Sequence, residues 1–282
     1  MIKRLVLTAF LLYAVCSFSQ TVSADDLEVE LADDGHFTCT FDGIGHELIV
    51  EFPAEPEGSP LVLMLHGYGN TAESFRSTTG FHEEAVPRGF TVVYVTSSSI
   101  GWNAGMGSSS NRDTEFLVAL AEYFQSEFGC DSEHTYAVGF SNGGFMAHRL
   151  AMEAGETFAA AVSVAGTAAD SVWEARPKEL KTGFFQITGE KDDVVPKNSD
   201  GSAKYAIVPA IEDVIAYYAE ANGLTLDESE EIGKGSLLEK YSDPSSDRRV
   251  WSLSVKDGRH SWPEEKITGI KTNTLILDFL AS

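Results

Sequence analysis

Short apolar runs alternate with helical periodicities along the chain, and this alternation limits the possible fold more than any other feature. Runs of four to six largely apolar residues predict buried strands at 61–65, 91–95, 135–140, 160–165, 184–187 and 250–255. Continuous apolar runs of this length are typical of parallel strands that are covered on both faces. Two further segments are joined by a turn that contains glycine, and they predict an antiparallel hairpin at 36–41 and 46–52. The pattern predicts an α/β fold: a mostly parallel, eight-stranded sheet with helices on both faces.

Three stretches have the spacing of amphipathic helices. The first has an apolar residue at every fourth position, namely Phe116, Leu120, Phe124 and Phe128. Asp113 precedes this face and is its expected N-cap. Similar faces are expected within residues 207–218 and 270–279. We interpret the apolar residues of all three as core.

The remaining polar segments give no sign of a second domain. Residues 227–235 and 242–249 are expected to be surface loops around a short connector. There is no internal repeat and no linker rich in proline and serine. We therefore expect a single catalytic domain over residues 25–282.

The first 24 residues have the features of a secretory signal peptide. Lys3 and Arg4 precede an apolar run from Leu5 to Val15, and Val22-Ser23-Ala24 offers a cleavage site. The run is too short to cross a hydrocarbon core of about 30 Å, so we expect no membrane anchor after cleavage. The expected destination is the extracellular space or the periplasm.

The balance of charge excludes several classes of partner. The chain has 43 acidic and 20 basic residues, which gives a formal charge of −23. A surface this acidic repels phosphates, so neither nucleic acid nor an anionic membrane is an expected partner. Cleavage of the signal peptide would remove two of the basic residues and would leave the surface still more acidic.

Two cysteines, Cys39 and Cys130, follow the signal peptide. An oxidising compartment would allow them to pair, and two separate buried thiols are an equally good interpretation. Cysteine and histidine do not occur at the spacings of a metal site. We therefore expect no metal and no cofactor.

Residues 139–143, Gly-Phe-Ser-Asn-Gly, predict a nucleophile. A strand ends and a helix begins here, and such a turn exposes its serine only when the residues two positions away are small. A serine hydroxyl needs a base, and hydrolases with this elbow follow the order serine, acid, histidine. Two histidines follow Ser141. His148 lies on the same helix and is expected to be a packing or surface residue, so His260, in the loop after the last predicted strand, is the candidate base.

The loop after the strand at 184–187 offers three carboxylates. They are Glu190, Asp192 and Asp193. Spacing does not choose between the two aspartates, while Glu190 stands at the start of the loop and is the weaker candidate. The acid's role is to fix the imidazole tautomer and to stabilise the imidazolium.

A tetrahedral intermediate needs an oxyanion hole, which is expected here from two backbone N–H groups. The residue after the nucleophile, Asn142, gives the first. The second is expected from Tyr68, in the glycine-containing loop that begins with His66. His66 itself precedes the nucleophile, so we assign it to the packing of that loop.

Several motifs together resemble the polyhydroxybutyrate depolymerase-like esterases, which include the feruloyl and acetylxylan esterases of carbohydrate esterase family one. The motifs are Leu65-His66-Gly67-Tyr68-Gly69, Gly101-Trp102-Asn103-Ala104-Gly105, 113–117, 136–150, 189–196 and His260-Ser261-Trp262-Pro263. The resemblance implies the α/β-hydrolase fold. Its Gly-x-x-Asp-x-x-Val-Pro pattern selects Asp192 as the acid, and it implies that Trp102 and Trp262 line the acyl pocket. Ordinary core packing is the alternative for both tryptophans. This chain lacks cysteines that relatives often carry near Trp102 and after residue 223, so the shape of the substrate rim is expected to differ.

These observations predict a secreted serine carboxylic ester hydrolase. The expected substrates are acetyl or feruloyl esters of plant cell-wall oligosaccharides, and polyhydroxyalkanoate oligomers are the second choice. A serine peptidase of the prolyl-oligopeptidase type shares the fold, but it normally needs a gating domain that this length does not provide. A non-catalytic carbohydrate-binding protein would be expected to have lost part of the triad, whereas every position is filled here.

Overall fold

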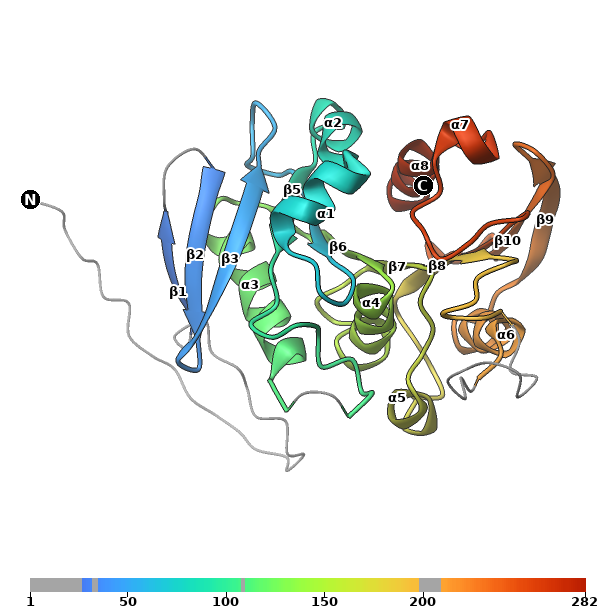
Figure 1. Cartoon of the computed structure of the whole chain (residues 1–282), viewed down its shortest axis with the longest axis horizontal. Helices are drawn as coiled ribbons and strands as arrows, with labels where there is room; N and C mark the ends of the chain where they lie inside the picture. Colours follow the sequence, from blue (N-terminus) through green and yellow to red (C-terminus); the bar gives the residue numbers. More distant parts are fainter. Residues whose placement is uncertain (1–26, 32–34, 108–109, 198–208) are drawn as a thin grey trace, which may run out of the picture.

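The computed structural model describes residues 27–31, 35–107, 110–197 and 209–282, and these residues form one layered α/β unit (Figure 1). The strand order of the sheet is β1-β2-β3-β5-β4-β6-β7-β8-β11-β10-β9. The six strands from β5 to β11 in this order are mutually parallel. The remaining strands, β1 to β3 on one side and β10 and β9 on the other, each pair antiparallel with their neighbours. The signal-peptide prediction falls outside the described residues. Within them, no helix is long and apolar enough to cross a membrane.

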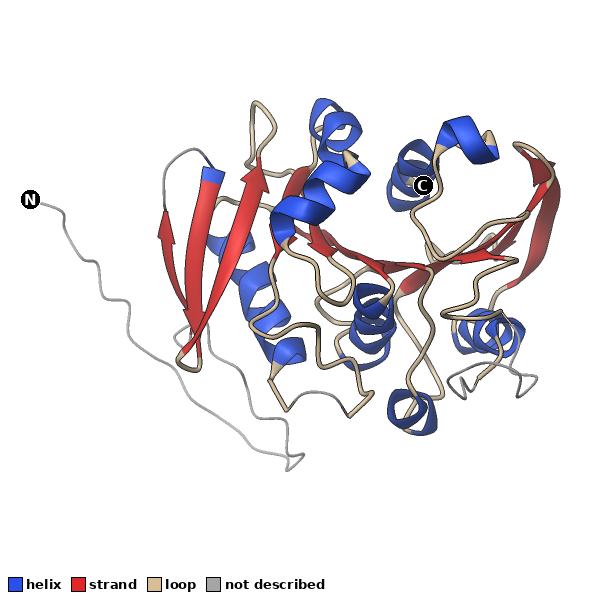
Figure 2. Cartoon of the chain, viewed as in Figure 1, coloured by secondary structure: helices blue, strands red, loops and turns tan. Residues whose placement is uncertain are grey.

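The strands and helices follow each other in the order expected of an α/β chain (Figure 2). In chain order they are β1 (Leu27–Leu31), β2 (His36–Phe41), β3 (Ile44–Glu51), β4 (Pro60–Leu65), α1 (Ala72–Thr79), α2 (Phe81–Ala85), the 3₁₀ helix η3 (Val86–Arg88), β5 (Thr91–Val95), α3 (Asp113–Glu127), β6 (Asp131–Phe140), α4 (Asn142–Glu153), β7 (Ala160–Val164), α5 (Asp170–Glu174), β8 (Gly183–Gly189), α6 (Ile211–Ala221), β9 (Thr225–Ile232), β10 (Ser236–Ser242), β11 (Val250–Val255), α7 (Glu265–Thr268) and α8 (Thr272–Ala281).

Helices cover both faces of the sheet, as the buried strands require. One layer contains α3, α4, α5 and α6, and the other contains α1, α2, α7 and α8 (Figure 1). In β4, Leu61, Leu63 and Leu65 pack into the first layer, whereas Val62 and Met64 pack into the second. This alternation follows from the two-residue period of a strand. The prediction of a mostly parallel sheet with helices on both faces is confirmed.

The sheet has eleven described strands, not the eight predicted. Two of the additional strands, β9 and β10, form a hairpin over residues that we expected to be mostly loop and connector. Every residue of β9 except Ile232 is exposed. The Lys240 ammonium of β10 bonds the carboxylates of Glu228 and Glu230 on β9. An edge strand with both faces in solvent has no apolar alternation, so the sequence pattern did not reveal it.

Helix α3 begins one residue earlier than predicted, because Asp113 was the expected N-cap. Arg112 occupies the N-cap position and Asp113 is the first helical residue. The Asp113 carboxylate does not cap the helix, because its Oδ2 accepts a hydrogen bond from the Asn103 backbone N–H at 2.6 Å. The predicted face at 207–218 forms α6 from Ile211 onward, and Ile207 lies outside the described residues.

Cys39 and Cys130 are separate thiols, and both are buried. Burial raises the pKa of Cys39 to about 12 and also raises that of Cys130. Each therefore stays protonated at neutral pH and packs as a small apolar side chain.

His148 is fully buried in α4, in agreement with its assignment as a packing residue. Its Nε2–H donates to Gln186 Oε1 at 2.9 Å, and the Tyr218 hydroxyl donates to its Nδ1 at 3.2 Å. Burial lowers the pKa of His148 from 6.5 to about 3, because the imidazolium would lose its hydration.

We expect His148 to make the fold less stable in acid. The unfolded chain takes up a proton on this side chain below about pH 6.5, whereas the folded chain does not until about pH 3. As the pH is lowered through this window, His148 should therefore reduce the free energy of unfolding by about 1.4 kcal/mol per pH unit. Urea unfolding from pH 7 to pH 4 checks this. His148→Gln should reduce the dependence of the free energy of unfolding on pH by the equivalent of about one bound proton. The matched variant His36→Gln, at an exposed position, should not reduce it. Equal pH dependence in the wild-type protein and both variants would contradict the prediction.

Candidate active site

Three loops at the carboxyl edge of the sheet bring Ser141, Asp192 and His260 together. They follow β6, β8 and β11, whose carboxyl ends share one edge because the strands are parallel. His260 Nδ1 lies 2.8 Å from Asp192 Oδ2, and His260 Nε2 lies 2.8 Å from Ser141 Oγ. A carboxylate only accepts, so Nδ1 carries the proton and Nε2 is free to accept the serine hydroxyl proton.

Of the three carboxylates in the loop after β8, only Asp192 is buried. Its Oδ1 accepts hydrogen bonds from the backbone N–H groups of Val194 at 2.9 Å and Val195 at 2.8 Å. These two bonds leave Oδ2 to His260 and hold the carboxylate rigidly. Asp193 and Glu190 are exposed, and within the described part of the chain neither forms a hydrogen bond with His260.

The loop that carries Asp192 is attached to the loop that carries His260. The Lys191 backbone N–H donates to Gly258 O at 2.7 Å. A Cβ atom at Gly189 would lie only 2.6 Å from the same oxygen, so the two backbones are in direct contact. This attachment fixes the distance between the segments that carry Asp192 and His260.

The turn at Ser141 is strained in the manner that a nucleophile elbow requires. Ser141 has φ 52° and ψ −117°, a conformation that residues other than glycine seldom adopt. A Cβ atom at Gly139 would overlap the Gly143 carbonyl group, and one at Gly143 would overlap that of Leu65. The two glycines are thus required by contact between backbones.

The predicted oxyanion donors lie on either side of the nucleophile. Asn142 opens α4, where the backbone N–H groups have no partner within the helix and the helix dipole is positive. Tyr68 follows Gly67, and a Cβ atom at Gly67 would lie 3.4 Å from Ser141 Cβ. The Tyr68 N–H donates no hydrogen bond within the residues that the structure describes. Both N–H groups are therefore available to a substrate oxygen.

His66 supports the loop that carries the predicted oxyanion donor Tyr68, in agreement with its assignment to the packing of that loop. It is fully buried, its Nδ1–H donates to Gly67 O at 2.7 Å, and its Nε2 accepts from the Ser97 backbone N–H at 3.0 Å. Burial lowers its pKa, so the ring stays neutral and keeps both bonds.

The expectation that Trp102 and Trp262 line the acyl pocket is not met by their positions. Trp102 is 0% exposed and Trp262 is 8% exposed. The Trp102 indole N–H donates to His66 O at 3.0 Å, and that of Trp262 donates to Asn273 Oδ1 at 3.1 Å. Both side chains pack in the core and hold loops of the site in place by hydrogen bonds. Their positions agree with core packing, the alternative interpretation of these two residues.

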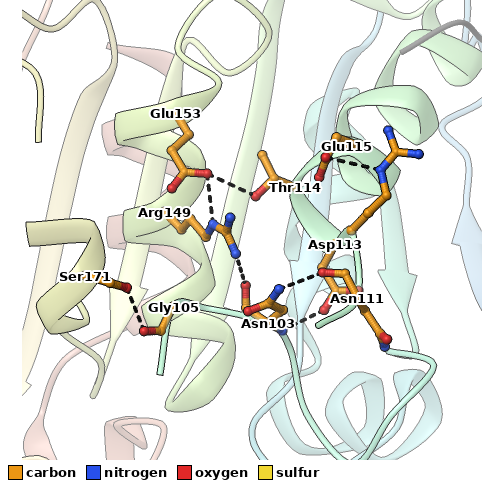
Figure 3. Close-up of polar contacts among 10 residues, drawn as sticks. Asn103, Gly105, Asn111, Asp113, Thr114, Glu115, Arg149, Glu153 and Ser171 are labelled. Atoms are coloured by element: carbon orange, nitrogen blue, oxygen red, sulfur yellow. Dashed lines mark hydrogen bonds and ion pairs between the residues drawn. The ribbon is translucent and has the colours of Figure 1, made fainter. Parts of the chain in front are cut away.

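A polar cluster that the sequence did not reveal holds the loop of residues 101–105 (Figure 3). Besides its bond to Asp113, Asn103 donates from Nδ2 to Asn111 O at 2.7 Å and accepts at its backbone oxygen from Arg149 Nη1 at 2.6 Å. Arg149 Nε bonds Glu153 at 2.8 Å. These contacts come from several elements and fix the far end of the loop that carries Trp102.

Comparison with known proteins gives the chain a family. The protein named "Putative esterase NocK", from Nocardia uniformis subsp. tsuyamanensis, is 32% identical in an alignment of 237 residues that covers 75% of this chain and 67% of that protein. The bifunctional acetylxylan esterase/xylanase XynS20E of Neocallimastix patriciarum is 26% identical, over 54% of this chain and 22% of that protein. Feruloyl esterase B of Neurospora crassa is 28% identical, over 38% of this chain and 39% of that protein. The chain thus spans less than half the length of the last two.

Two further comparisons concern the fold. Residues 101–175, which include Ser141, match the model of the prolyl oligopeptidase family. The structure of an acetyl xylan esterase from Aspergillus awamori superposes with a TM-score of 0.64 at 13% identity, covering 90% of this chain and 98% of that one. The fold and the sequence relationship agree. The chain belongs to the α/β-hydrolase esterase family and is a carboxylic ester hydrolase.

Proposed function

We propose that the chain hydrolyses esters through Ser141, His260 and Asp192 by way of an acyl-enzyme. The observation that carries this proposal is the continuous hydrogen-bonded chain from Ser141 Oγ through the imidazole to Asp192, with 2.8 Å at each step. Ser141 Oγ attacks the ester carbonyl carbon while His260 Nε2 takes the hydroxyl proton. The carbonyl oxygen becomes an oxyanion, which accepts from the N–H groups of Tyr68 and Asn142.

The tetrahedral intermediate then collapses. The bond to the alcohol oxygen breaks, and His260 returns its proton to that oxygen, so the alcohol leaves and the acyl group stays on Ser141. A water molecule attacks the acyl carbon while His260 again takes a proton. The bond between the acyl carbon and Ser141 Oγ then breaks, His260 returns its proton to Oγ, and the acid is released. Asp192 stays ionised throughout and stabilises the imidazolium that forms twice in each cycle.

We propose acetyl or feruloyl esters of plant cell-wall oligosaccharides as substrates. The names of the relatives support this choice, and so does the charge of −23, which disfavours anionic substrates at long range. The rim of the site supports an aromatic acyl group. The Tyr68 and Ile100 side chains are both 59% exposed, and the Gly69 backbone N–H bonds Ile100 O, so the two loops meet beside the nucleophile. Export directed by residues 1–24 would deliver the enzyme to such material.

A panel of substrates tests this proposal. We expect kcat/KM for methyl ferulate or acetylated xylo-oligosaccharides to exceed that for hydroxybutyrate oligomers by a factor of ten or more. A preference for the hydroxybutyrate oligomers would overturn the substrate while leaving the mechanism untouched. Because residues 101–175 match the prolyl oligopeptidase family, the panel includes a prolyl p-nitroanilide; cleavage of this amide with indifference to esters would favour a peptidase.

Tyr68→Ala sharpens the test. The variant removes an exposed ring and keeps the backbone N–H, so the oxyanion hole loses no donor. If Tyr68 contacts an aromatic acyl group, KM for methyl ferulate should rise about tenfold, as expected for the loss of one ring contact. Hydrolysis of a simple acetyl ester is the control and should change little. Equal losses on both esters would argue against an aromatic acyl site at Tyr68.

A further inference from the structure

The side chain of Asn142 has no place in the reaction described above, yet it is one of the best-held polar groups near the nucleophile. Asn142 is 4% exposed. The Trp102 backbone N–H donates to Asn142 Oδ1 at 2.6 Å, and Asn142 Nδ2 donates to Trp102 O at 3.3 Å. The amide thus pairs with both backbone groups of a single residue, 40 positions earlier in the chain. A buried amide pair of this kind fixes both the distance and the orientation of the two segments that it joins.

Trp102 carries this connection onward to the second oxyanion donor. Its indole N–H donates to His66 O. His66 is two residues before Tyr68, and its own ring bonds Gly67 O. A continuous path of hydrogen bonds therefore runs from Asn142, through Trp102, to the backbone that presents the Tyr68 N–H.

Packing leaves this path little freedom. A Cβ atom at Gly101 would lie 2.7 Å from Asn142 Oδ1 and 2.9 Å from the Tyr68 ring, so the loop is enclosed between the two residues that supply the donors. The other end of the loop is held by Asn103, through the polar cluster of Figure 3. Asn142 is thus attached to a loop that is itself fixed.

We propose that the Asn142 side chain is a positioning residue that sets the separation of the two oxyanion donors, with Trp102 as the connecting element. This inference rests on the proposed function, because it assigns Asn142 a role in stabilising the oxyanion of the Ser141 reaction. The side chain does not touch substrate; it acts through the Trp102 backbone. Its effect should appear in the transition state, where the oxyanion exists, and not in the binding of the neutral ester.

Asn142→Ala tests this role, since the variant keeps the backbone N–H of residue 142 and removes only the amide. Removing one oxyanion donor outright lowers kcat by about 10² to 10³. Displacing the two donors without removing either should therefore lower kcat by about 10- to 100-fold. KM for p-nitrophenyl acetate should stay within about twofold, as for an interaction made only in the transition state. Affinity for phenylboronic acid, which forms a tetrahedral adduct with a reactive serine, should fall by the same factor as kcat. Trp102→Phe, which removes the bond to His66 O together with part of the buried indole, should give a smaller change of the same kind.

Asn222→Ala is the matched control. Asn222 is 3% exposed, and its Nδ2 also bonds two backbone carbonyl groups, those of Thr182 and Tyr218. These contacts lie at the start of β8, at the opposite edge of the sheet from Ser141. The control should lower the melting temperature about as much as Asn142→Ala while leaving kcat and boronate affinity unchanged. If the control loses activity equally, the effect of Asn142 is general destabilisation and the inference is overturned.

A fluorophosphonate probe separates failure of this inference from failure of the proposed function. The probe reacts with an activated serine, and its phosphoryl oxygen occupies the oxyanion hole. If the wild-type protein is labelled at Ser141 and Asn142→Ala is labelled equally fast, the inference is wrong and the function stands. If the wild-type protein is neither labelled nor active on esters, the proposed function fails and the inference falls with it. Slower labelling of Asn142→Ala, with Asn222→Ala unchanged, supports both.

Discussion

Replacing Ser141 with alanine is expected to lower kcat for p-nitrophenyl acetate by about 10⁵ to 10⁶, because the members of a triad act as a unit. Without Oγ no acyl-enzyme forms, and His260 has no hydroxyl to deprotonate. The oxyanion donors and the substrate site would remain, so a small residual rate above the uncatalysed reaction is expected. Steady-state kinetics of the purified variant measures the loss.

Ser163→Ala is a suitable control for this result. Ser163 is buried in β7, next to the strand that ends before Ser141, and its hydroxyl has no hydrogen-bond partner among the described residues. Removing an unpaired hydroxyl costs little, so kcat should stay within a few fold of wild type. Turnover by Ser141→Ala at more than about a hundredth of the wild-type rate would rule out Ser141 as the nucleophile.

Asp192→Asn is expected to lower kcat by about 10⁴, because an amide facing His260 Nδ1 favours the wrong tautomer. The new amide nitrogen would donate where the carboxylate accepted, so the imidazole proton would move to Nε2 and block proton transfer from Ser141. The backbone bonds from Val194 and Val195 could still form at Oδ1. The fold should therefore survive, and circular dichroism can check this.

Asp193→Asn is the matched control, since it makes the same chemical change one residue away. Asp193 is exposed, and its replacement should change kcat by no more than a few fold. The reverse ranking, with Asp193→Asn the slower enzyme, would assign the acid to Asp193 and contradict the hydrogen bond between Asp192 and His260. Equal mild effects would mean that neither carboxylate orients the base.

Much of this protein could be predicted from local patterns in its sequence. Apolar runs of four to six residues identified the buried strands, because a strand covered on both faces has few polar positions. The elbow at residues 139–143 was recognisable because its glycines are required by backbone contacts two positions from Ser141. His260 was a candidate because few histidines follow the nucleophile. Each of these features depends on residues that are close in sequence, or on order along the chain.

Other features depended on contacts between distant segments. The hairpin of β9 and β10 was missed because an exposed edge strand carries no apolar pattern. Spacing left Asp192 and Asp193 equal, and the resemblance to a family favoured Asp192. The structure shows the physical difference: only Asp192 turns inward, where two backbone N–H groups hold it.

The tryptophans and Asn142 show the same limit most clearly. An aromatic residue beside a catalytic motif suits a substrate pocket and a core equally well, and only the packing around Trp102 buries it completely. The pairing of Asn142 with Trp102 joins segments 40 residues apart, and no periodicity relates them. The sequence by itself determined which strands, turn and chemical groups the protein has. Tertiary structure alone decided which of those groups meet, because burial and hydrogen bonding between loops depend on how the sheet brings the carboxyl ends of its strands together.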